Sequence, residues 1–343
     1  MRELKILAVV VVLTLITYWG VEPFAHSQMH PHVDPVNYNF EEADRQTSKE
    51  GVEKAQKALD EADKTADAKA VKGAKTDLEA AQTFEKTINE FWDTNKAAIA
   101  ATPNVANGET LVAANCTACH SIESKGFPKL MDDASTAGAY GVTTPDLGSS
   151  GKLYSKEYLI AFIKNPALAS KVSHKFTDGR VHPMPAYELM NTPQEIADMV
   201  AYLQSIAPKE MTNKEVFADA CQRCHGIKYA DMLGGSMVAF TPNNDIENYM
   251  GKLPPDLSQY IISRGPDYLG KFINDPQKLL EGTAMPRVGL NQESQEQVIK
   301  YMEEIGTSKK AEREELGPKF LIYMVIFAIF GFLWKAVKWR DVH

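Results

Sequence analysis

The sequence predicts an all-α protein in which one small helical domain occurs twice. Three observations support this prediction. A set of short motifs recurs in the same order between residues 103 and 308. The segment before this repeat is rich in Ala, Lys, Glu and Asp and carries apolar residues at helical spacing. Long apolar stretches occupy both ends of the chain, as expected of terminal transmembrane helices.

Composition restricts the classes of protein to consider. The chain has 343 residues, enough for two or three domains. Its 44% hydrophobic and 24% charged residues are typical of a folded protein. A net charge of −8 without a basic stripe argues against a nucleic-acid partner. The four cysteines are too few for a disulfide-rich scaffold, and they fall into two closely spaced pairs.

Residues 1–27 are interpreted as an export segment. A short basic start precedes an apolar run from Ile6 to Val21, which is the pattern of a secretory signal. Ala25, His26 and Ser27 could form a cleavage site, but the run is also long enough to cross a membrane. A cleaved signal peptide and a retained signal-anchor helix therefore both stay open.

Residues 317–339 are predicted to form a C-terminal transmembrane helix. The sequence is apolar without interruption from Phe320 to Trp334. We expect this helix to begin at Gly317 and Pro318, because proline is tolerated in the first turn.

Residues 28–102 are expected to form a helical hairpin arm. Two helices between residues 40 and 100 would meet at a turn near Thr65–Lys69. The charge pattern favours a solvated spacer. Phe84, Phe91 and Trp92 favour an arm that docks on a partner subunit.

Residues 103–208 and 209–308 are predicted to be two copies of one domain. Each copy contains a Cys-x-x-Cys-His motif, then Pro-Asp-Leu, then Met-Pro, and closes with an amphipathic helix. The paired landmarks are Cys116–His120 and Cys221–His225, Pro145–Leu147 and Pro255–Leu257, and Met184–Pro185 and Met285–Pro286. The first closing helix is expected to start at a capping Thr192, with Glu195 as the third helical residue.

The Cys-x-x-Cys-His motif is typical of covalent haem c attachment. Two thiols one helical turn apart can reach the two vinyl groups, and the adjacent imidazole can bind the iron. A thioredoxin-like redox pair needs no histidine, and a zinc site would need ligands from both motifs. The sequence therefore predicts two covalently bound haem c groups, held by Cys116, Cys119 and His120 and by Cys221, Cys224 and His225.

Methionines are predicted to be the sixth iron ligands. The chain has no histidine between His225 and His343, so Met285, followed by Pro286, is the candidate in the second domain. Met184 holds the matching position in the first domain. Methionine–histidine ligation raises the haem potential and leaves no open position, which favours electron transfer over peroxide chemistry.

Other side chains compete for these roles. His174 and His182 are rivals of Met184 as iron ligands in the first domain. In the second domain the rivals of Met285 are Met232, Met237, Met250 and Met302, of which Met302 is expected to pack in the core. Arg264 is the candidate partner of a haem propionate, and Arg287 and Arg180 are weaker candidates.

Each repeat resembles a class I cytochrome c domain, so the fold class becomes tandem class I cytochrome c domains with an N-terminal hairpin. The second repeat and its tail are similar to cytochrome c1, the haem subunit of cytochrome bc-type quinol–cytochrome c reductases. This second resemblance covers residues 205–343. The residues that carry it are Cys224–Tyr229, Pro254–Ser258, Arg264, Asp267, Tyr268 and Trp339–His343. Ordinary cytochrome c1 carries one haem, so the chain is more similar to the two-haem cytochrome c subunits of bacterial bc-type complexes.

This resemblance implies an electron-transfer subunit rather than an enzyme by itself. A Rieske iron–sulfur subunit would deliver electrons to the second haem, and the first haem would pass them to a periplasmic cytochrome c or a terminal oxidase. A b-type cytochrome would pack against the tail helix, in a dimeric complex. The alternatives are a subunit of a terminal oxidase or a periplasmic dehydrogenase, and a dihaem peroxidase.

The chemistry also implies an orientation. Cytochromes c mature outside the cytoplasm, so we expect the haem domains in the periplasm and the C-terminus in the cytoplasm, at a bacterial inner membrane. The basic residues after the tail helix agree with the positive-inside tendency.

Overall fold

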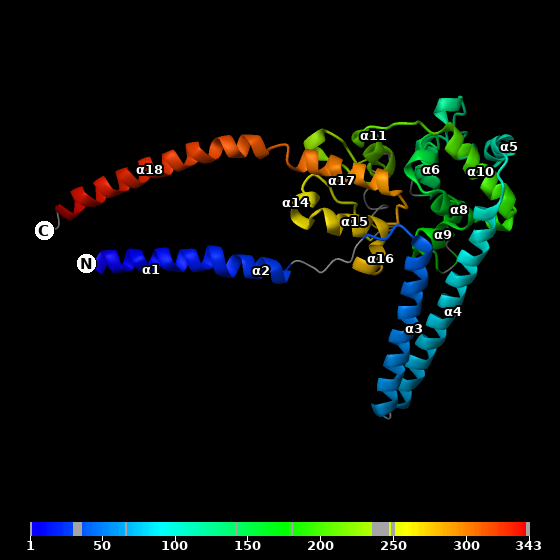
Figure 1. The fold of residues 1–343 in the computed structure, drawn as a ribbon, viewed down its shortest axis with the longest axis horizontal. Coiled ribbons are helices and arrows are strands. Elements are labelled where there is room, and N and C mark those ends of the chain that lie inside the picture. Colours follow the sequence, from blue (N-terminus) through cyan, green and yellow to red (C-terminus); the bar gives the residue numbers. More distant parts are fainter. Residues whose placement is uncertain are drawn as a thin grey trace. The chain divides into compact units, whose positions relative to one another are not determined.

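The computed structural model describes residues 2–29, 36–65, 67–140, 143–177, 179, 181–234, 247 and 251–340. These residues are mostly helical, and among them β-structure is limited to isolated bridges. The predicted all-α fold class is therefore confirmed (Figure 1). Met237, Met250, Arg180 and the last three residues, including His343, lie outside the described residues.

The N-terminal segment forms its own unit, Met1–Val36. Helix α1 (Arg2–Ile16) passes through a π-helical turn, η1 (Thr17–Val21), into α2 (Glu22–Met29). Within this unit the 22 residues Leu4–Ala25 are apolar enough to cross a membrane. The hydroxyls of Thr14 and Thr17 donate to the carbonyls four residues earlier, at 2.9 Å each, so both polar groups are satisfied inside the helix.

The hairpin consists of α3 (Phe40–Thr65) and α4 (Ala68–Ala100), which run side by side (Figure 1). Asp67 caps α4, because its carboxylate accepts from the backbone N–H of Lys69 at 2.9 Å. Buried side chains concentrate at the base of the hairpin: Phe40, Asp44, Ser48, Ile88, Phe91, Trp92, Asn95 and Ala98. Leu59 is the exception farther out along α3.

The first repeat is built around the packing of its first helix on its closing helix. Helices α5 (Val105–Asn115) and α10 (Pro193–Ile206) contact each other closely, and a Cβ at Gly108 would collide with the Asp198 carbonyl. Thr192 and Glu195 form the predicted capping box at the start of α10. Between these helices lie η2 (Glu123–Lys125), α6 (Asp133–Tyr140), α7 (Ser150–Leu153), α8 (Lys156–Lys164), α9 (Pro166–Ala169), η3 (Ser173–Lys175) and η4 (Tyr187–Leu189).

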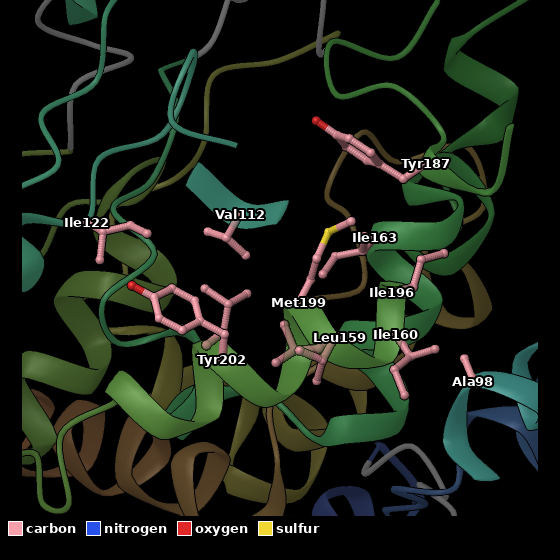
Figure 2. Close-up of a cluster of buried hydrophobic side chains, with 12 residues drawn as sticks. Ala98, Val112, Ile122, Leu159, Ile160, Ile163, Tyr187, Ile196, Met199 and Tyr202 are labelled. Atoms are coloured by element: carbon pink, nitrogen blue, oxygen red, sulfur yellow. The ribbon is translucent and has the colours of Figure 1, made fainter. Parts of the chain in front are cut away.

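One apolar cluster fills this domain. Figure 2 shows Leu159, Ile160 and Ile163 of α8 gathered with Met199 of α10, close to Val112 of α5. All five side chains are at most 7% exposed. Burial of such aliphatic side chains stabilises a fold by roughly 1.5–3 kcal/mol each, so this cluster is a main source of stability for the first domain.

The second repeat has the same plan. Its first helix, α11 (Asn213–Phe217), continues as a π-helical turn, η5 (Ala218–Gln222), and packs on the closing helix α17 (Gln292–Gly306). In the described part of the chain between them lie η6 (Lys228–Ala230), α14 (Tyr260–Arg264), α15 (Pro266–Asn274) and α16 (Pro276–Leu279). Leu153, from α7 of the first repeat, is buried in the core of the second. The two repeats therefore share a packed seam.

Helix α18 (Lys310–Arg340) carries the C-terminal apolar segment. It begins at Lys310, so the expected start at Gly317 is wrong and Pro318 lies inside the helix. The charged residues before Gly317 extend the helix, with pairs such as Lys319 and Glu315 at 2.6 Å. The apolar part from Phe320 to Trp334 is exposed, as expected of a helix that faces lipid.

Candidate haem-attachment sites

Each cysteine pair lies on a single turn at the end of the first helix of its repeat. In the first repeat the carbonyl of Cys116 accepts from the N–H groups of Cys119 at 3.1 Å and His120 at 2.9 Å. In the second repeat the carbonyl of Cys221 accepts from the following pair, Cys224 and His225, at the same two distances. The predicted attachment residues of each motif are thus brought together locally, with the same hydrogen-bond pattern.

The imidazoles are oriented by proline carbonyls. His120 Nδ1 lies 2.8 Å from the carbonyl oxygen of Pro145, and His225 Nδ1 lies 2.8 Å from that of Pro255. Because a carbonyl can only accept, Nδ1 must carry the proton, which leaves the lone pair on Nε2 for a metal. Burial lowers the pKa of both histidines, although the hydrogen bonds to the prolines act in the opposite direction. Both rings are therefore neutral at neutral pH, the form that binds iron.

The aspartate of each Pro-Asp-Leu motif holds the neighbouring turn. Asp146 Oδ2 accepts from the N–H of Glu123 at 2.9 Å, and Asp256 Oδ2 accepts from that of Lys228 at 2.8 Å. The leucine that follows closes each loop, with the Leu147 N–H donating to the Ser121 carbonyl at 2.9 Å. The Pro-Asp-Leu motif is thus more than a landmark of the repeat, because its proline and aspartate position the histidine and the turn that follows it.

The thiols lack the properties of a redox-active pair. Burial raises the pKa of Cys116 to about 12, and the neighbouring Cys119 adds to this effect. Burial likewise raises the pKa of Cys221 to about 12 and also raises that of Cys224. Reactive Cys-x-x-Cys pairs have lowered values, because the thiolate is the nucleophile. The thioredoxin-like interpretation is therefore disfavoured.

A zinc site is also disfavoured. Within the described ranges, no three His, Cys, Asp or Glu side chains converge as a metal site. Each motif instead supplies two thiols and one neutral imidazole whose Nε2 is free of the proton, and this donor set fits covalent haem c.

A cavity of about 920 Å³ lies away from both attachment motifs, between the base of the hairpin and the second repeat. Phe40 and Arg287 are among its lining residues.

In the first repeat the structure separates the candidates for the sixth ligand. Met184 is half-buried and packs against the apolar cluster of the domain. The ring of His182 turns toward its own backbone, with Nδ1 at 3.0 Å from the Met184 carbonyl oxygen, and its edge contacts Phe176. His174 is exposed. Met184 stays the prediction for this position.

In the second repeat two rivals of Met285 belong to the core. The sulfur of Met232 accepts a hydrogen bond from the Tyr301 hydroxyl at 3.1 Å, and its side chain is 7% exposed. Met302 is buried on α17, as expected. Met285 is half-buried, and its N–H donates to the Thr283 hydroxyl at 3.3 Å. Met285 therefore stays the predicted ligand of the second iron.

The two arginines that the structure describes among the propionate candidates have different partners. The guanidinium of Arg264 stacks over the ring of Tyr268 at 5.4 Å, and its predicted contact with a propionate stays a prediction. Arg287, a weaker candidate for the same role, is 1% exposed and binds Asp44 of the hairpin. Its buried guanidinium donates to Asp44 and to the Asn274 carbonyl, so a propionate role for Arg287 is disfavoured.

Comparisons with known proteins agree with this geometry. The cytochrome c family matches residues 105–207 and 212–306, more than half of the chain. The "Cbb3-type cytochrome c oxidase subunit FixP" of Sinorhizobium medicae (strain WSM419) is 31% identical over 133 residues, which are 36% of this chain and 39% of that protein. The chain thus spans well under half of the length of this relative.

A solved structure is also similar in part. A chain of "Hyperthermophilic respiratory Complex III" has 22% sequence identity and covers 38% of this chain and 75% of its own length. Its TM-score is 0.27, a likeness too slight to support an assignment.

Proposed function

Because the chain belongs to the cytochrome c family, we propose that it is a membrane-anchored dihaem electron-transfer subunit of a respiratory complex. One observation carries this proposal: both attachment motifs present a neutral imidazole whose Nδ1 is 2.8 Å from a proline carbonyl oxygen. Two identical iron-binding arrangements in one chain support two covalently bound haem c groups. The apolar helices at the two ends of the chain support the membrane anchor.

The proposed ligand sets follow the repeat. Cys116, Cys119 and His120 would hold the first haem, with Met184 as sixth ligand, and Cys221, Cys224 and His225 would hold the second, with Met285. When bound, the haem supplies one-electron redox chemistry. With a histidine and a methionine as the proposed ligands, each iron would have no open position, so a peroxidase function is disfavoured. Arg264 would neutralise a propionate of the second haem.

Two complexes are candidates for the assembly. The match to a cbb3-type oxidase subunit supports a terminal oxidase, the first candidate. In that assembly the chain would pass electrons toward the oxygen-reducing subunit. The C-terminal helix α18 and the resemblance of residues 205–343 to cytochrome c1 favour the second candidate, a quinol–cytochrome c reductase with Rieske and b-type cytochrome subunits.

The proposed orientation follows from haem attachment outside the cytoplasm. The two haem domains would face the periplasm of a bacterial inner membrane. The end of α18, with Lys338 and Arg340 in its last turn, would then lie on the cytoplasmic side.

Purification from the native membrane in mild detergent tests this proposal. Mass spectrometry of the chain should report the added mass of two haems and show whether residues 1–27 are retained. Identification of the co-purifying subunits separates the candidates, since an oxygen-reducing subunit indicates the oxidase and a Rieske protein indicates the reductase. A chain with the mass of bare polypeptide would refute the proposal.

A further inference from the structure

Arg287 is held by three different parts of the protein. Its Nε donates to the carbonyl of Asn274 in the second repeat at 2.9 Å. Its Nη1 and Nη2 donate to the two oxygens of Asp44 in the hairpin at 2.8 and 2.5 Å. Its backbone N–H donates to the Ser170 carbonyl of the first repeat at 2.9 Å, and its carbonyl accepts from the Tyr158 hydroxyl at 2.8 Å. No rotation of this residue is available without breaking a buried hydrogen bond.

Asp44 is equally constrained from the side of the hairpin. It is 4% exposed and accepts from Trp92 Nε1 of α4 at 3.2 Å. Lys171 of the first repeat lies 3.4 Å from one of its oxygens and 2.7 Å from Asp275 of the second repeat. The two carboxylates and the two cations balance in charge, so removal of one member would leave a buried charge uncompensated. The ionised carboxylate of Asp44 is therefore a fixed anchor for Arg287.

Because Arg287 lies close to Met285 in the chain, anchoring Arg287 also restricts Met285. It lies two residues after Met285, and Pro286 between them restricts the backbone. A fixed Arg287 therefore limits where the thioether of Met285 can reach. In the first repeat the matching residue after Met184 and Pro185 is Ala186, whose methyl group cannot form an ion pair. The hairpin thus reaches the loop of Met285 through a charged anchor that the loop of Met184 lacks.

We propose that Asp44 of the hairpin is a positioning residue for Met285, which it holds in place through the bidentate contact with Arg287. This inference rests on the proposed ligand set and assigns a role to the base of the hairpin. The first haem site, with Ala186 in place of the arginine, has no equivalent anchor.

The test uses the full-length holoprotein in detergent with the substitution Asp44→Asn. This change keeps the shape of the side chain and removes the charge that anchors Arg287. Three quantities are measured: the sulfur-to-iron charge-transfer absorption of the oxidised protein, the reduction potential of each haem, and carbon monoxide uptake by the reduced protein. Met285→Leu and Met184→Leu are measured in parallel, because they assign each signal to its haem.

We expect Asp44→Asn to reproduce the signature of Met285→Leu. The second haem should lose its share of the charge-transfer band, shift to a lower potential and bind carbon monoxide, because thioether ligation raises the potential. The first haem should be unchanged. Asp93→Asn is the matched control: it removes a 2.7 Å pair with Arg45 on the same hairpin, and its side chain is 64% exposed. This control should behave as the unmodified protein.

Arg287→Lys and Trp92→Phe keep the test decisive if Asp44→Asn is not recovered as folded protein. Lysine keeps the charge but lacks the planar fork. Trp92→Phe removes the 3.2 Å hydrogen bond to Asp44 together with part of a side chain that is 2% exposed. Each should weaken ligation of the second haem alone, with the lysine variant affected more. An unchanged second haem in these variants, or equal changes at both haems, would overturn the positioning role. If Met285→Leu itself leaves the second haem unchanged, the proposed ligand set fails instead.

Discussion

Gly289 lies on the seam between the two repeats and should not tolerate a side chain. Its φ of +74° is in the left-handed region, and a Cβ there would collide with the ring of Tyr158. Tyr158 cannot withdraw easily. It is 3% exposed, its hydroxyl donates to the Arg287 carbonyl at 2.8 Å, and its ring contacts Phe40 at 5.5 Å. Gly289→Ala should therefore separate or strain the seam.

Two effects set the loss of unfolding free energy expected for Gly289→Ala. Left-handed backbone costs an alanine roughly 1–2 kcal/mol. Overpacking against a fixed core side chain costs about 1–3 kcal/mol more. The substitution should lower the free energy of unfolding by about 2–5 kcal/mol. Gly282→Ala is the matched control, because Gly282 has a φ of +79° and no atom within 4 Å of the position of its Cβ. It should cost only about 1–2 kcal/mol, the backbone effect alone.

Urea unfolding of the detergent-solubilised holoprotein, followed by tryptophan fluorescence, measures both variants. Tyr158→Ala combined with Gly289→Ala completes a double-mutant cycle, and the pair should be less destabilised than the sum of the single changes. Equal losses for Gly289→Ala and Gly282→Ala, or strict additivity in the cycle, would refute the proposed collision at the seam.

Three further predictions concern haem attachment and pH. Cys116→Ser with Cys119→Ser should reduce covalent haem from two groups to one per chain, measured by mass; retention of both would contradict the attachment assignment. The pKa of Asp198 lies below its usual 3.8, because burial is outweighed by hydrogen bonds from three neighbours. Its contribution to stability is therefore present above pH 3.8 and is lost as the pH falls through the lower folded value, and Asp198→Asn should flatten acid unfolding curves in this range. Burial lowers the pKa of Lys164 from 10.5 to about 8, so the unfolded chain binds more protons between these values and stability should rise with pH across that window. Lys164→Met should abolish this rise in unfolding experiments, and a persistent rise would assign it to another group.

The attachment sites could be predicted because their residues are contiguous in the chain. Cys116 and His120 belong to one turn, and the same turn recurs at Cys221, so local geometry repeats with local sequence. The capping box at Thr192 was predictable for the same reason, since all its contacts lie within three residues. The hairpin turn is similar, because Asp67 caps the helix that follows it.

Long-range partners could not be predicted in this way. Arg287 and Asp44 are 243 residues apart, and sequence alone suggested a propionate as the partner of this arginine. Met232 was a candidate ligand until the structure showed its sulfur bonded to Tyr301. Phe127 holds the matching position in the first repeat. It forms an isolated bridge with Ile122, just as Met232 forms one with Ile227. Pairings of this kind depend on which elements pack together.

The sequence by itself determined the helical class and the duplication and predicted the chemistry of both attachment motifs, because helix periodicity and thioether formation depend on residues within a few positions of one another. Only the tertiary structure decided that proline carbonyls orient His120 and His225, that the repeats share a seam at Gly289, and that the hairpin reaches the loop of Met285 through Asp44. Those arrangements depend on burial and on charges brought together from distant parts of the chain. Their free energies exist only once the domains have packed.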